Sequence, residues 1–308
     1  MTAVDELRAR LRGVIAPTVT PFAEDGELWF PGVRRVIDFL VEADVTAIIP
    51  GDLIGECLSL TLDERRALIA ESVQAVGGRM AVVGNAADAS LQNAIDLGRF
   101  SRKADVDLIK LGLPYPYTPA AATMLDMLRR IDDAVDMPFL VESSDALTIP
   151  LEVIASLCER PNFVGVEEWG SDIGRMDRLF SEFSRRLVVL PSGEAALLFL
   201  CLRGAPGLIA AEANFAPRFM SEFLGASQRR DLDRALALFG RRRRYRDLFR
   251  EGLARGVPLF TPYAKAAMAI LGLPVGPPRP PLAPLTEGET ARLREVLRQE
   301  FDLLVGGA

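Results

Sequence analysis

The sequence contains no histidine, and this absence limits the chemistry that its side chains can perform. Histidine is the commonest general base near neutral pH and the commonest ligand of transition metals. Lysine is also scarce, with Lys103, Lys110 and Lys265 as the three examples against 33 arginines. Any covalent amine chemistry must therefore use one of these three side chains or the amino terminus.

Cysteine and long apolar runs are scarce as well. The three cysteines are widely spaced in apolar surroundings, which is typical of free thiols in a reducing compartment and not of a disulfide framework. No apolar run approaches the length of a membrane span, and residues 1–13 lack the layout of a signal peptide. A net charge of −6 argues against nucleic acid or a membrane surface as the partner. We therefore expect a cytoplasmic protein that binds a small molecule.

Short apolar segments alternate with amphipathic segments through most of the chain. The apolar segments predict eight strands, over residues 13–22, 45–51, 80–85, 106–113, 138–142, 163–168, 187–193 and 207–213. The segments between them have helical periodicity, and Thr61 with Glu64 predicts a capping box at the start of one helix. Eight such units predict a closed (β/α)₈ TIM barrel. An open doubly wound sheet is the alternative, but no glycine-rich phosphate turn follows the first strand.

The alternation stops beyond Pro217. Residues 227–252 predict a long arginine-rich helix, and residues 262–271 and 286–303 predict two more helices around a proline-rich stretch. We predict a barrel domain over residues 1–225 and a helical extension over residues 226–308. The arginines of the long helix predict a solvated or subunit-contact face, made of Arg241 to Arg244, Arg246 and Arg250.

Two adjacent glutamates end the predicted sixth strand. Because strand side chains alternate, Glu167 and Glu168 should face opposite sides of it. A carboxylate at the end of an apolar strand needs an ion partner, water or a ligand. Hydrated glutamates at an ordinary strand-to-loop transition are the alternative interpretation.

Acidic residues also follow several other predicted strands, at the end where barrel enzymes place their sites. They are Asp52, Glu56, Glu142, Glu194 and Glu212. Crowded carboxylates raise one another's pKa unless a cation separates them. Three uses are open: a divalent ion such as Mg²⁺, a cationic ligand, or one protonated glutamic acid that acts as a general acid. The alternative is that several of these side chains point outward or cap helices.

Three other residues near the predicted mouth have two interpretations each. Lys110 lies near the end of the fourth strand; facing inward it would be a nucleophile, but we expect it to lie on the outer face, paired or snorkelling between helices. Tyr115 belongs to a proline-spaced aromatic loop that covers the mouth or seals a subunit contact. Trp169 lines the pocket or fills the gap between barrel and helix.

Motifs from nearly the whole chain carry a family resemblance. They are Val19-Thr20-Pro21-Phe22, Gly55-Glu56, Leu58-Ser59-Leu60-Thr61, Pro114-Tyr115, Gly165-Val166, Ser192-Gly193-Glu194, Asn214-Phe215-Ala216-Pro217, Lys265-Ala266-Ala267 and Pro278-Arg279-Pro280. In this order they resemble the dihydrodipicolinate synthase and N-acetylneuraminate lyase family of class I aldolases and hydro-lyases. The resemblance implies a TIM barrel, a homotetramer or homodimer, and an active-site role for Tyr115.

The resemblance also implies a chemistry from which this chain departs. The family forms a Schiff base between a 2-keto acid and a lysine of the sixth strand, and Glu167 stands at that position. The family's tyrosine of the fifth strand is matched by Val141 or Glu142, and its two hydroxyl residues by Leu53 and Ile54. The arginine expected over residues 143–148 is missing. A carboxylate cannot form an imine.

The first hypothesis is a lyase or hydro-lyase that acts on a small keto- or hydroxy-acid without a Schiff base at the sixth strand. Acid–base catalysis would come from Glu167, Glu142 or Glu56, with no cofactor unless it is a divalent cation. The residues expected to bind substrate are Asp52, Leu53, Ile54, Tyr115, Val141, Glu168, Trp169 and Glu212. One alternative is a non-catalytic, ligand-binding or regulatory protein, and another is an aldolase that forms its imine at Lys110.

Overall fold

Eight strands form one sheet in the computed structural model, which describes residues 3–112, 118–254 and 260–304. The order of the strands is β7-β6-β5-β4-β3-β2-β1-β8, and β7 also lies against β8, so the sheet returns on itself. The strands are β1 (Gly13–Thr18), β2 (Ala47–Pro50), β3 (Ala81–Asn85), β4 (Leu108–Leu111), β5 (Phe139–Ser143), β6 (Phe163–Glu168), β7 (Val188–Pro191) and β8 (Gly207–Ile209). The predicted (β/α)₈ TIM barrel is confirmed.

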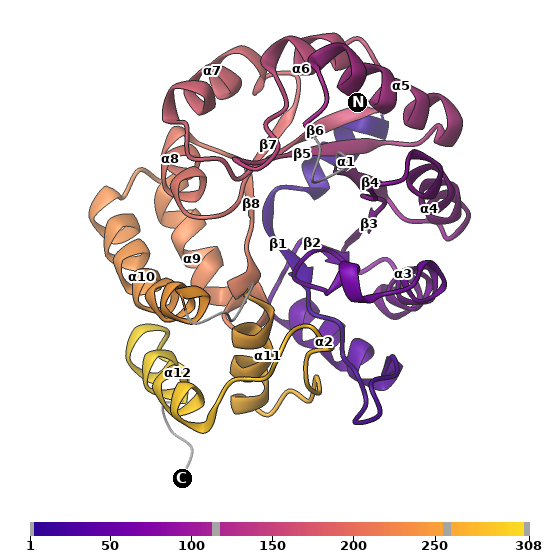
Figure 1. Ribbon diagram of the computed structural model, residues 1–308. Coiled ribbons are helices and arrows are strands. Elements are labelled where there is room, and N and C mark those ends of the chain that lie inside the picture. The colour runs from indigo at the N-terminus through magenta and orange to yellow at the C-terminus, as the bar shows by residue number, and fades with distance from the viewer. Residues whose placement is uncertain (1–2, 113–117, 255–259, 305–308) are drawn as a thin grey trace. The chain divides into compact units, whose positions relative to one another are not determined.

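Helices alternate with these strands along the chain, as the colour sequence of Figure 1 shows. They are α1 (Ala3–Arg10), α2 (Phe30–Glu42), α3 (Leu62–Val76), α4 (Leu91–Lys103), α5 (Ala121–Val135), α6 (Leu151–Leu157), α7 (Ile173–Phe183) and α8 (Ala195–Arg203). The predicted capping box is confirmed at α3, where the Thr61 hydroxyl accepts from the Glu64 amide and the Glu64 carboxylate accepts from the Thr61 amide.

Contacts divide the chain into two compact units. The first unit, residues 1–15, 46–49 and 78–210, contains the paired strand residues. Apolar side chains from each strand form its core, among them Leu108, Leu140 and Val164, with Leu7 of α1 and Leu11 just after it. These core positions give each strand a defined inner face, which determines where the polar side chains at the strand ends lie.

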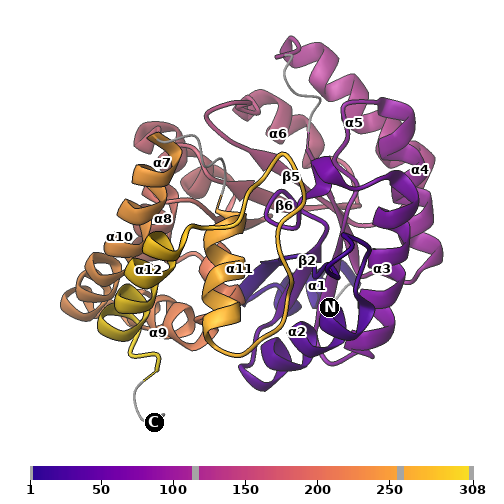
Figure 2. The same ribbon diagram turned by 60° about the horizontal axis from the view of Figure 1, so that its bottom comes forward.

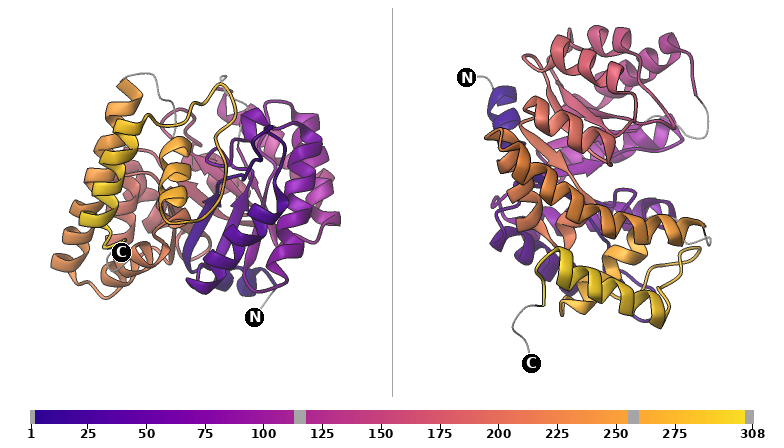
Figure 3. Two further views of the ribbon diagram at one scale, coloured as in Figure 1. Left: turned by 90° about the horizontal axis from the view of Figure 1, so that it is seen from below. Right: turned by 90° about the vertical axis from the view of Figure 1, so that its left-hand side faces the viewer.

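The second unit comprises residues 16–45, 50–77 and 211–308. It contains α9 (Pro217–Gln228), α10 (Leu232–Ala254), α11 (Thr261–Ile270) and α12 (Glu287–Glu300). Helix α12 packs against both α10 and α11, and Figures 2 and 3 show these helices side by side. The division into domains 1–225 and 226–308 stays a prediction.

The long helix predicted from residue 227 begins later than expected. Helix α9 continues to Gln228, and α10 starts at Leu232. Between them Arg230 has a φ of 60°, a left-handed conformation that cannot continue a helix. Across the described ranges, no helix combines the length and apolar character that a membrane span requires.

Candidate functional site

Lys110 lies on the inner face of β4, contrary to the expected outward orientation. Leu108, two residues before it, belongs to the core of the first unit, and strand alternation places Lys110 on the same face. The side chain is only 2% exposed. The sequence pattern could not decide this orientation, because a shift of one residue in strand register exchanges the two faces.

Two carboxylates flank the Lys110 ammonium. Its Nζ lies 2.7 Å from Glu142 Oε2 of β5 and 2.8 Å from Glu167 Oε2 of β6. Glu142 and Glu167 are partners in the β5–β6 register, so their side chains project from neighbouring positions. Glu142 is 24% exposed, whereas Glu167 is 5% exposed. The structure therefore brings together three of the four residues expected to be catalytic, with Glu142 the member most open to solvent.

Trp169 contacts the other carboxylate oxygen of Glu142. The indole Nε1 donates a hydrogen bond of 3.0 Å to Glu142 Oε1. Burial would raise the pKa of Glu142, but the charge and hydrogen bond of Lys110 and the Trp169 hydrogen bond more than offset this and lower it below its usual value. Glu142 is thus a carboxylate at neutral pH, held on both oxygens.

Glu168 and Val141 face away from Lys110. The predicted opposite orientation of Glu167 and Glu168 is confirmed, since Glu168 pairs with Arg175 of α7. Val141 is fully buried and follows Leu140 of the core, so alternation turns it to the other face of β5. Neither residue lies on the strand face that carries Lys110 and Glu142, and their expected role in substrate binding stays a prediction.

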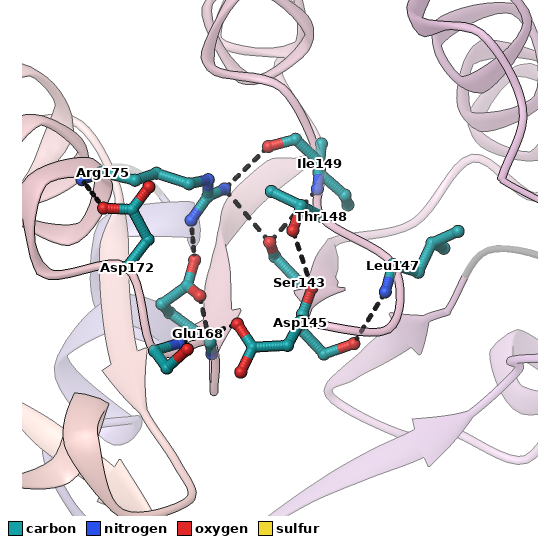
Figure 4. A network of polar contacts seen from close by, with 11 residues as sticks. Ser143, Asp145, Leu147, Thr148, Ile149, Glu168, Asp172 and Arg175 are labelled. Carbon is teal, nitrogen blue, oxygen red and sulfur yellow. Dashed lines mark hydrogen bonds and ion pairs between the residues drawn. The ribbon is translucent and has the colours of Figure 1, made fainter.

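Arg175 contacts the last residues of β5 and β6 and the segment that follows β5 (Figure 4). Its guanidinium pairs with Glu168 and donates to Ser143 Oγ (3.1 Å) and to the Ile149 carbonyl (2.7 Å). The Gly170 amide donates to Glu168 Oε1 at 2.9 Å. Because Trp169 lies between Glu168 and Gly170, this network fixes the backbone from which the indole reaches Glu142. Sequence reasoning missed Arg175, which is one of many arginines on helix surfaces and carries no motif.

Arg175→Met is expected to lower the free energy of unfolding by about 3 kcal/mol, because Glu168 is buried and loses its cationic partner. The same change should make the Trp169 side chain more mobile. In a Trp29→Phe background Trp169 is the single tryptophan, so its fluorescence reports the change directly. We expect emission at longer wavelength and stronger quenching by acrylamide. Arg178→Met removes an exposed arginine of the same helix and should leave the emission wavelength and the acrylamide quenching unchanged. Unaltered Trp169 emission in a folded Arg175→Met protein would contradict this role.

Glu56 is held inside the second unit by another ion pair. Its Oε1 lies 2.7 Å from Lys265 Nζ, and its Oε2 accepts from the Arg279 amide at 2.7 Å. The side chain of Glu56 is 0% exposed. Burial lowers the pKa of Lys265 to about 8, and the Glu56 charge only partly counteracts this. Both carboxylate oxygens are thus engaged within the protein, and a role for Glu56 in acid–base catalysis stays a prediction.

Glu212 is also committed to a buried pair. Its Oε1 lies 2.8 Å from Arg242 Nε of α10, and both side chains are 3% exposed or less. Burial raises the pKa of Glu212, but the charges of Arg242 and Arg246 outweigh it and lower the value. Glu212 thus pairs with a cation of its own unit, and its expected role in substrate binding stays a prediction. Arg242 is buried, contrary to the solvated face expected for it.

Three of the other residues expected to bind substrate lie in the second unit. Asp52 is buried after β2, and its carbonyl accepts from the Cys57 amide. Leu53 and Ile54 are half-buried, and the Ile54 carbonyl accepts from Thr261 Oγ1 at 3.0 Å. Tyr115 lies outside the described residues.

The predicted divalent cation stays a prediction. Within the described ranges, no group of three or more acidic or cysteine side chains is arranged to hold a metal ion. Between Glu142 and Glu167 the cation that separates the carboxylates is the Lys110 ammonium. The charge compensation expected for crowded glutamates is therefore supplied by the chain itself.

Comparison with known proteins gives a consistent result. The profile of the dihydrodipicolinate synthetase family matches residues 10–300. A 4-hydroxy-tetrahydrodipicolinate synthase of Methanopyrus kandleri is 29% identical over 97% of this chain and 99% of its own length. The same enzyme of Nitrosospira multiformis is 30% identical over 94% of this chain and 95% of its own.

Solved structures agree in fold. A dihydrodipicolinate synthase of Bacillus anthracis has a TM-score of 0.85 at 25% identity, covering 94% of this chain and 98% of its own. A prophage protein of the dihydrodipicolinic acid synthase family from E. coli K12, solved in complex with pyruvate, has the same score, identity and coverage.

Proposed function

The chain belongs to the dihydrodipicolinate synthetase family, and we propose that it is a lyase of this family that works without a Schiff base at the sixth strand. The observation that carries the proposal is the Lys110 ammonium between the carboxylates of Glu142 and Glu167. The proposed substrates are small keto- or hydroxy-acids, a class supported by the pyruvate complex of the E. coli relative.

The departure at the sixth strand supports this proposal. In the family pattern, the lysine of a Gly-Ile-Lys-Glu motif forms the imine, and the matching residues here are Gly165-Val166-Glu167-Glu168. Glu167 is buried and paired with Lys110, so the side chain at that position is a carboxyl group and not an amine. It cannot act as the electron sink of an imine mechanism.

Glu142 is the proposed general base. It is the most exposed of the three side chains, and its lowered pKa keeps it ionised at neutral pH. It would take a proton from the carbon next to the substrate carbonyl, and the electron pair left on carbon would delocalise onto the carbonyl oxygen. The Lys110 ammonium would stabilise that developing enolate charge. Expulsion of a β-hydroxyl, protonated by the Glu142 carboxylic acid, would release water and complete a hydro-lyase step.

An imine at Lys110 is the second candidate. The observation that favours it is the inward orientation of Lys110, whose Nζ lies 2.8 Å from the carboxylate at the family's lysine position. An amine in this place could attack a substrate carbonyl once Glu142 or Glu167 had taken its proton. Two flanking carboxylates favour the protonated amine, and this favours the first candidate.

Proton exchange tests the first candidate without knowledge of the full reaction. Incubation of 2-keto acids, pyruvate included, in D₂O should give enzyme-dependent loss of the C3 proton signals by NMR. Glu142→Gln is expected to slow this exchange by about 10²–10⁴-fold. Glu182→Gln changes an exposed glutamate of α7 and should exchange at the wild-type rate. Full exchange activity in Glu142→Gln would contradict the proposal.

Borohydride reduction distinguishes the lyase without an imine from the enzyme that forms an imine at Lys110. Reduction in the presence of the same acids should leave the protein mass unchanged under the first candidate. A stable adduct on the Lys110 peptide would establish the second instead. Binding of an acid with neither exchange nor adduct would favour the non-catalytic alternative. A homotetramer or homodimer and a cytoplasmic location stay predictions.

A further inference from the structure

A pocket in the first unit lies at the start of β6, whereas Glu167, the partner of Lys110, lies near the end of that strand. Its volume is about 480 Å³. The residues that define its character are Arg8, Arg160, Arg185, Arg186, Phe163 and Leu187. They come from α1, from the segment between α6 and β6, from the first residue of β6, and from the segment between α7 and β7. Nothing in the proposed lyase chemistry uses this pocket.

The lining is strongly basic in a chain with a net charge of −6. Four of its residues are arginines, and no acidic residue is among those that line it. Three of the arginines pair with carboxylates that do not line the pocket: Arg160 with Asp132 and Asp133, Arg186 with Glu159, and Arg8 with Asp5. Within the described residues, Arg185 is the lining arginine without a carboxylate partner, so the charge of the wall depends mainly on Arg185 and on the donors that Arg8 and Arg186 keep open.

These three arginines retain hydrogen-bond donors. Arg185 makes no hydrogen bond or ion pair with any other residue of the described ranges. Arg186 donates from Nη2 to the Cys158 carbonyl (2.9 Å) and to Glu159 (3.1 Å), which leaves its Nε and Nη1 donors for another group. Arg8 makes two long bonds, at 3.3 Å to Asp5 and 3.4 Å to the Phe163 carbonyl.

We propose that this pocket binds a small organic phosphate. Guanidinium groups match the oxygens of a phosphate with two parallel N–H donors, and they are the preferred side chains for such recognition. Phe163 and Leu187 supply an apolar wall for the carbon skeleton of the ligand. A volume of about 480 Å³ exceeds what inorganic phosphate needs and suits a small metabolite. This inference is independent of the proposed lyase function.

Binding is tested by isothermal titration calorimetry of the full chain at low ionic strength. The probes are inorganic phosphate, a sugar phosphate, a nucleoside monophosphate and succinate. At least one organic phosphate should bind more tightly than inorganic phosphate and succinate, and its affinity should fall as salt is raised. Failure of both organic phosphates to bind the wild-type protein would overturn the proposal, and so would equal affinity for succinate.

Two matched double variants place the site. Arg185→Ala with Arg186→Ala is expected to weaken organic phosphate binding at least tenfold, and both residues are exposed, so the fold should persist. Arg130→Ala with Arg178→Ala removes the same charge from exposed positions outside the pocket and should bind as the wild type does. An equal loss of affinity in the two variants would show non-specific attraction and overturn the assignment.

Discussion

Lys110→Met is expected to lower the free energy of unfolding by about 3–5 kcal/mol at pH 7, the usual cost of removing one partner of a buried ion pair. The substitution keeps an unbranched side chain of similar length but deletes the ammonium. Glu142 and Glu167 then remain as two neighbouring anions, each of which had lain within 2.8 Å of Lys110 Nζ. Urea unfolding at pH 7 measures the change.

The stability lost in Lys110→Met should depend on pH. In the wild type the folded pKa of Glu142 is lowered, so its pairing contributes stability above the usual carboxyl pKa and loses it as the pH falls through the folded value. In Lys110→Met burial without the ammonium should raise the carboxyl pKa values, so protonation relieves the penalty. We therefore expect the gap between variant and wild type to narrow as the pH falls from 7 toward 4.

A triple variant controls for the loss of packing. Lys110→Met with Glu142→Gln and Glu167→Gln removes the whole charge group, and it should be more stable than Lys110→Met alone at pH 7. If both variants unfold at the same urea concentration as the wild type, the three side chains do not form a buried ion-pair group.

Arg242→Met is expected to cost about 3–5 kcal/mol, because Glu212 is 1% exposed and would lose its nearest cation. Arg246 also lowers the pKa of Glu212, so part of the electrostatic compensation remains and the lower end of this range is expected. As with Lys110, acid should narrow the difference from wild type. Urea unfolding at pH 7 and pH 5 measures both effects.

The neighbouring residue provides the control for Arg242. Arg243 is exposed in the same helix, so Arg243→Met should change stability by no more than about 0.5 kcal/mol. Equal effects of the two substitutions would mean that Arg242 lies on a solvated face, as the sequence had suggested.

The sequence predicted those features that depend on residues close together in the chain. Short apolar runs, with helical periodicity between them, predicted the strands of the barrel, because burial of one face imposes a short repeat on each segment. The capping box at Thr61 was predicted from residues three apart. Strand alternation was sufficient to place Glu167 and Glu168 on opposite faces without knowledge of any partner.

The identity of each ionic partner was beyond such reasoning. Glu56 with Lys265 and Glu212 with Arg242 join residues distant in sequence. Glu56 had been expected to act in acid–base catalysis and Glu212 to bind substrate. A count of carboxylates at strand ends indicated an anionic mouth, whereas these two charges are neutralised inside their own unit. Periodicity gives the face of an element but not the residue that packs against it.

The amino-acid sequence by itself determined the barrel and the family pattern, and it is the source of the proposal that Glu167 stands in place of the imine-forming lysine. Only the tertiary structure decided that Lys110 points inward and lies between Glu142 and Glu167. The physical reason is the hydrogen-bonded register of β4, β5 and β6, which determines the face of the sheet on which each side chain lies. This register depends on the pairing of all three strands and not on the sequence of any one of them.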